Sequence, residues 1–74
     1  MSATSNAGRA TTAFQALERF YDADRSDCAE AMLEHVTDAL ADLRHFCGQR
    51  GIDYARAARL AELHFKAEVC EEEA

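Results

Sequence analysis

Four carboxylates in this sequence recur at every fourth residue. They are Glu30, Glu34, Asp38 and Asp42, here called the acidic row. In a helix, residues four apart lie on one face, and like charges at this spacing destabilise the helix by roughly 0.2–0.5 kcal/mol per pair. Such an unopposed row predicts a surface that docks on a basic groove of a partner protein. A solvated helix face is the alternative interpretation.

Basic side chains gather near a predicted turn in the second half of the chain. This basic cluster consists of Arg44, Arg50, Arg56 and Arg59. Because guanidinium groups bind carboxylates through several N–H donors, this cluster could form a second binding surface, either for an acidic partner or between subunits. Alternatively, the arginines pair locally with Asp42 and Asp53.

Two Asp–His pairs have the spacing of helical metal ligands: His35 with Asp38, and Asp42 with His45. Di-metal sites in helical bundles also need several converging glutamates, and a zinc site with Cys47 would need a second ligand pair. A cysteine nucleophile would need a positioned base and an oxyanion hole, and no glycine-rich phosphate loop is present. The sequence therefore predicts no metal site, no cofactor and no enzymatic activity.

The elements that must position these residues are helices. Proline is absent, glycine occurs three times, and no segment alternates like a strand. We expect a first helix from about Thr12 to Ala23 and a second from Ser26 or Asp27 to Gly48, with Asp27 and Glu30 forming a capping box. A third helix should follow Asp53 as its N-cap.

Apolar residues at 3–4 spacing define how these helices should pack. The second helix carries a series that ends at Leu40, Leu43 and Cys47, and the third carries Ala58, Ala61 and Phe65. The prediction is an all-α fold of three helices, a long antiparallel helical hairpin with an N-terminal helix packed on it. Residues 1–10 should form a disordered tail, 11–70 a single helical domain, and 71–74 an acidic C-terminal tail.

Composition narrows the possible partners and the compartment. The chain has 74 residues and a net charge of −6, which argues against direct binding to nucleic acid or an anionic membrane. No apolar run approaches the roughly 18 residues that span a bilayer. The odd number of cysteines, Cys28, Cys47 and Cys70, indicates reduced thiols and a cytoplasmic protein.

Three segments carry a resemblance to known proteins: Asp38–Cys47, Gly51–Tyr54 and Ala61–Glu68. Over about residues 36–68 the chain resembles small uncharacterised accessory proteins of plasmids, phages and genomic islands. The resemblance implies the context of a mobile genetic element, where small acidic proteins often act as inhibitors of host defence, including anti-CRISPR and anti-restriction proteins. It includes no catalytic motif, and no functional residue is carried over from it.

Two functional hypotheses follow. The first is a non-enzymatic inhibitor of a bacterial defence complex, which docks the acidic row on the basic surface of a nucleic-acid-handling enzyme. The second is a homo-oligomeric structural or regulatory adaptor of a mobile element that acts through an apolar surface. A two-helix hairpin leaves apolar surface exposed, so a homodimer is compatible with both.

Overall fold

A computed structural model describes residues 5–73, and this part of the chain contains three α-helices and no strand. The helices are α1 (Asn6–Phe20), α2 (Ala29–Arg50) and α3 (Tyr54–Glu73). The predicted all-α class with three helices is confirmed.

Helix α1 begins earlier than its sequence pattern predicts. The Ser5 hydroxyl accepts the Gly8 backbone N–H at 2.9 Å and caps the helix. Residues 6–10 are therefore helical, so the prediction of a disordered tail over residues 1–10 is wrong for them, and residues 1–4 lie outside the described part. The helix also ends at Phe20, before the predicted Ala23, because Asp22 adopts a left-handed conformation with φ 58°.

Both ends of α2 differ from the prediction by two or three residues. The helix begins after Cys28 without a side-chain cap. The predicted capping box does not form, because the Asp27 carboxylate accepts the Asp24 N–H at 2.9 Å and contacts His35. At the other end, the helix passes through Gly48 and stops before Gly51, whose φ is 68°.

Helix α3 starts where the sequence predicts. The Asp53 carboxylate accepts the Arg56 N–H at 3.0 Å, which confirms Asp53 as the capping residue. At its end the helix includes residues 71–73. The acidic segment is therefore the last turn of α3 and not a separate tail, while Ala74 lies outside the described residues.

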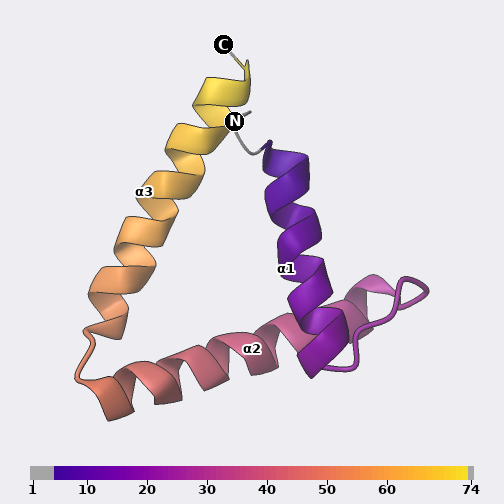
Figure 1. Cartoon of the computed structure of the whole chain (residues 1–74), viewed down its shortest axis with the longest axis horizontal. Helices are drawn as coiled ribbons and strands as arrows, with labels where there is room; N and C mark the ends of the chain where they lie inside the picture. The colour runs from indigo at the N-terminus through magenta and orange to yellow at the C-terminus, as the bar shows by residue number, and fades with distance from the viewer. Residues whose placement is uncertain (1–4, 74) are drawn as a thin grey trace.

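The three helices lie along the sides of a triangle and meet near their ends (Figure 1). Helices α2 and α3 diverge from the turn at Gly51, which is a more open arrangement than a close-packed hairpin. The physical reason is the position of α1, which lies between the start of α2 and the end of α3. With 15 residues it is about 22 Å long, and it holds those two ends apart.

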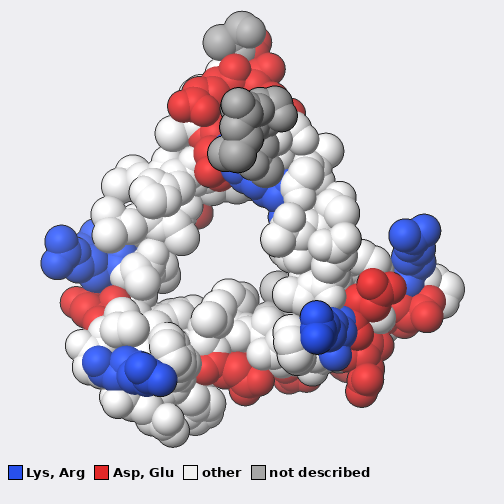
Figure 2. Space-filling view, viewed as in Figure 1, with Lys and Arg blue, Asp and Glu red and all other residues white. Residues whose placement is uncertain are grey.

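Little of the described chain is shielded from solvent. Within residues 5–73, only Ala23 and Cys47 are buried. The space-filling view shows an opening through the centre of the molecule, bordered mainly by uncharged side chains (Figure 2). None of the helices in the described part of the chain has the length and hydropathy needed to cross a membrane.

Candidate functional site

The acidic row forms an exposed surface of α2. All four of its carboxylates, on Glu30, Glu34, Asp38 and Asp42, are exposed. At 100° per residue they wind slowly along the side of the helix opposite Val36, Leu40 and Leu43. Figure 2 shows acidic side chains along the border of α2 that faces away from the central opening. Helix α2 therefore has an acidic outer side and an apolar inner side.

One member of the row contacts another helical segment. The hydroxyl of Tyr21, the residue directly after α1, donates a hydrogen bond to the Asp42 carboxylate at 2.9 Å. This hydrogen bond raises the pKa of Tyr21 above 10.0, and desolvation and the negative charges of Asp42 and Asp38 raise it further. The contact joins the acidic row to the end of α1.

No basic side chain of residues 5–73 forms an ion pair with the acidic row. The ion pairs in this part of the chain join Arg9 to Glu68 at 3.1 Å, Lys66 to Glu62 at 3.7 Å, and His35 to Asp27 at 3.1 Å if His35 is protonated. Neutralisation of the row is thus left to counterions or to a partner molecule.

The basic cluster lies beside the turn between α2 and α3, and all four of its arginines are exposed. Two of them stack on aromatic rings: the Arg44 guanidinium lies 5.5 Å from the Tyr54 ring centre, and that of Arg50 lies 5.1 Å from the ring centre of Phe46. The predicted local pairing with Asp42 and Asp53 is not seen among the described residues. Stacking of this kind orders the guanidinium groups while leaving their N–H donors accessible.

The possible metal ligands do not converge. Within the described part of the chain, no group of three or more His, Cys, Asp or Glu residues is arranged to hold a metal ion. His35 instead contacts the Asp27 carboxylate through Nε2 at 3.1 Å. The three cysteines are unpaired, and Cys47 is the buried one.

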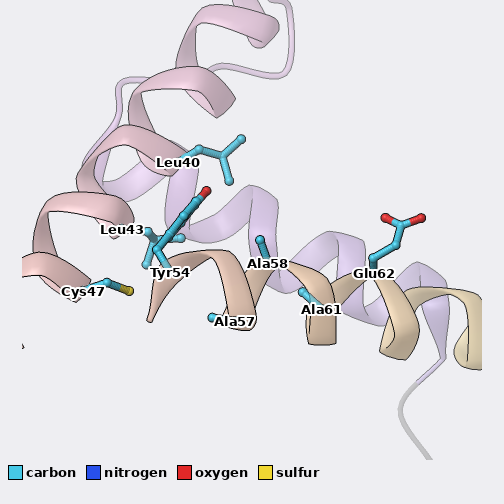
Figure 3. A pocket seen from close by; sticks show the side chains of 8 residues that line it. All are labelled: Leu40, Leu43, Cys47, Tyr54, Ala57, Ala58, Ala61 and Glu62. Atoms are coloured by element: carbon cyan, nitrogen blue, oxygen red, sulfur yellow. The ribbon is translucent and has the colours of Figure 1, made fainter. Parts of the chain in front are cut away.

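A groove of about 390 Å³ lies in the angle between α2 and α3. Figure 3 shows Leu40 and Leu43 of α2 opposite Tyr54 and the alanines of α3. We call this groove the inner face; it is lined by Leu40, Leu43, Cys47, Tyr54, Ala57, Ala58, Ala61 and Glu62. Because Glu62 supplies its only charge, the inner face is suited to bind an apolar surface.

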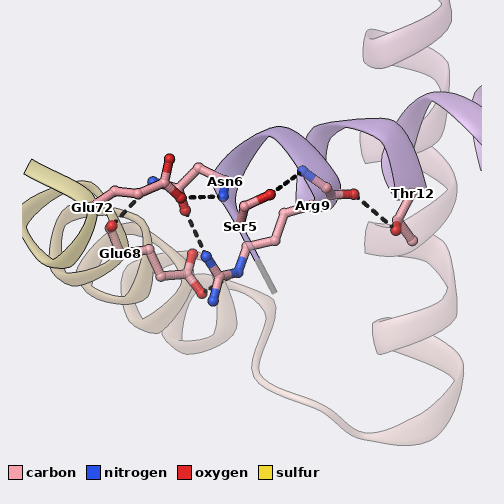
Figure 4. A network of polar contacts seen from close by, with 7 residues as sticks. Ser5, Asn6, Arg9, Thr12, Glu68 and Glu72 are labelled. Atoms are coloured by element: carbon pink, nitrogen blue, oxygen red, sulfur yellow. Dashed lines mark hydrogen bonds and ion pairs between the residues drawn. The ribbon is translucent and has the colours of Figure 1, made fainter. Parts of the chain in front are cut away.

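The angle between α1 and α3 is closed by polar contacts (Figure 4). The Asn6 side-chain amide donates to the Glu68 carbonyl at 3.0 Å, and its backbone N–H donates to the Glu72 carboxylate. Arg9 forms an ion pair with the Glu68 carboxylate. These contacts attach the first turn of α1 to the last turns of α3 and so close the triangle.

Comparison with protein-family models, curated proteins and solved structures finds no match to this chain. The resemblance to accessory proteins of mobile elements therefore stays a prediction.

The inner face is the site that motif reasoning did not identify. The apolar spacing predicts that Leu40 and Leu43 pack inside a helical hairpin, yet the structure leaves both residues about half exposed. The available signal was the row of alanines on α3, which allows close approach of another helix. Sequence spacing alone does not show whether that helix comes from the same chain.

Proposed function

We propose that this chain is a non-enzymatic protein-binding protein, and that the acidic row of α2 docks on a basic surface of a partner protein. The observation that supports this function best is the two-sided character of α2. Its carboxylates are exposed on the outer side without a basic partner in residues 5–73, while its leucines occupy the inner side.

The cost of the row to the helix supports a role beyond solubility. Three successive acid–acid pairs at i,i+4 each disfavour α2 by roughly 0.2–0.5 kcal/mol. The chain uses the stabilising alternative elsewhere, because Glu62 and Lys66 of α3 form an ion pair at this same spacing. When a basic surface neutralises these repelling charges, the repulsion is relieved and the helix is stabilised.

The partner class that fits this surface is an enzyme with a basic groove for nucleic acid. Direct binding to nucleic acid is disfavoured by the net charge of −6. The row places one acid per roughly 6 Å of helix, so it can occupy part of a phosphate-binding groove. In its most specific form, the proposal is an inhibitor of a bacterial defence complex, as the resemblance to accessory proteins implies.

The test is a charge reversal within the row. Glu34→Lys with Asp38→Lys should abolish capture of a nucleic-acid-handling enzyme from nuclease-treated bacterial lysate, while circular dichroism shows unchanged helicity. Binding by the unmodified chain should weaken steeply with salt, and duplex DNA should compete with it for the captured enzyme. Unchanged capture by the reversed variant would contradict the role of the row.

A matched control separates the row from overall charge. Glu71→Lys with Glu73→Lys makes the same change in net charge at exposed positions in the last turn of α3. The control should retain capture of the same enzyme. If it loses binding as completely as the row variant does, net charge and not the acidic row is responsible.

The exposed apolar side chains favour a second candidate, a homo-oligomeric adaptor that acts through its apolar surface. Leu40, Leu43 and Phe65 are 49%, 53% and 61% exposed. This function predicts binding that is sensitive to polar substitution at these residues and nearly independent of salt. Salt dependence of partner capture therefore discriminates between the two functions.

A further inference from the structure

The single chain exposes more surface than a folded monomer of its size. Its accessible area is 6347 Å² at a mass of 8.2 kDa. Folded monomers of this mass expose about 4,500 Å². The excess is about 1,800 Å² per chain, which is the area that each partner contributes to an obligate homodimer.

The chain is also more extended than a compact domain of its length. Its radius of gyration is 14.1 Å. A compact domain of 74 residues would have a radius of about 11 Å, and one of twice that length about 15 Å. One chain is therefore spread over the space that two closely packed chains would fill.

The inner face is complementary to itself in shape and polarity. Helix α2 contributes the large side chains Leu40 and Leu43, and α3 contributes the small side chains Ala58 and Ala61. Under a two-fold axis, the leucines of one copy can pack on the alanines of the other, and each contact occurs twice. A basic partner helix would find only Glu62 as a counter-charge in this groove.

We propose that a second copy of this chain covers the inner face, so that the protein is a homodimer held together by α2 and α3. The acidic row lies on the opposite side of α2 and stays exposed in such a dimer. The proposal is independent of partner docking by the row, and the two can fail separately.

The test is the molar mass of the full chain by light scattering at about 10 µM and about 1 mM, because assembly depends on concentration. We expect a mass of twice 8.2 kDa. Leu40→Lys with Leu43→Lys should reduce it to that of one chain. Since both leucines are about half exposed in the single chain, a chain that folds alone should keep both its mass and its helicity in this variant. A fully helical wild-type monomer at the higher concentration would overturn the proposal, as would any other number of copies.

A matched pair of leucines on α3 provides the control. Leu60 and Leu63 have the same three-residue spacing and are 42% and 56% exposed, but they lie on the side of α3 opposite Ala58 and Ala61. Leu60→Lys with Leu63→Lys should leave the dimer intact. A dimer lost in this variant but kept in the Leu40 and Leu43 variant would reject the inner face. The Glu34 and Asp38 reversal should keep the dimer mass, so loss of partner capture by that variant reports on the acidic row alone.

Discussion

At the scale of single residues, the contact between Tyr21 and Asp42 is the point where the acidic row touches another helical segment. The hydrogen bond requires a protonated phenol, which donates to an oxygen of the Asp42 carboxylate. Because it favours the protonated phenol, it raises the pKa of Tyr21 in the folded protein. Its contribution to stability is therefore fully present below the ordinary tyrosine pKa and is lost as the pH rises through the raised value.

The substitution Asp42→Asn should lower the pKa of Tyr21 towards 10.0, because the carboxylate acceptor and its negative charge are both removed. The measurement is phenolate absorbance against pH in a Tyr54→Phe background, where Tyr21 is the only tyrosine. The same titration with Glu30→Gln is the control, since Glu30 is not among the groups that raise this pKa. A titration midpoint that is the same with and without the Asp42→Asn substitution would show that the hydrogen bond is absent in solution.

At the scale of the elements, the end of α2 depends on the difference between two glycines. Gly48 lies inside the helix, whereas Gly51 follows it with φ 68°. The Gly51 and Ile52 N–H groups both donate to the Cys47 carbonyl, the latter at 2.9 Å. The Ile52 bond is the 6→1 bond of a Schellman motif and the Gly51 bond is the 5→1 bond of an αL motif, so a left-handed glycine closes the helix.

Alanine substitutions at the two glycines should have opposite effects. Gly51→Ala should destabilise the fold by about 1–2 kcal/mol, because a Cβ is strained in the left-handed region. Gly48→Ala should stabilise it by roughly 0.5–1 kcal/mol, since no atom lies within 4 Å of the added Cβ and alanine favours helix. Urea denaturation at one fixed protein concentration measures both. If both substitutions change the free energy of unfolding equally, α2 does not end at Gly51.

The sequence predicted the elements better than their ends. The Asp53 cap was identifiable because apolar periodicity begins directly after it. The cap at Ser5 could not be predicted because small and polar residues follow it, and the contacts from Asn6 and Arg9 to α3 that stabilise the first turn are tertiary. For α2, Gly48 and Gly51 are equally suited to end a helix, and only the conformation of the chain beyond them decides.

The acidic row could be located from spacing alone, and the structure places it as an exposed face. The inner face could not be predicted as a site, because a helix stripe containing Leu40 and Leu43 has the same pattern whether the same chain or another copy covers it. Whether the same chain or another copy covers these leucines depends on how the folded helices are arranged, and that arrangement is not encoded in the spacing of apolar residues.

At the scale of the whole molecule, the triangle of helices separates two kinds of surface. The carboxylates of α2 face outward, uncharged side chains border the opening, and Leu40 and Leu43 line the groove between α2 and α3 (Figures 2 and 3). A chain of this size with two buried residues in its described part lacks the core that normally offsets the conformational entropy of folding. Folding of this protein should therefore be coupled to its association, with the outer acidic side left for a partner.

The most direct test of this coupling is the urea midpoint of the wild-type chain at two protein concentrations that differ by about 100-fold. For a dimer that unfolds to two chains, mass action adds about 2.7 kcal/mol of stability over this range. With a urea dependence of about 1–3 kcal/mol per M, the midpoint should rise by about 1 M or more. A midpoint that is the same at both concentrations would show that one chain folds alone, and would contradict the account of the inner face as a subunit interface.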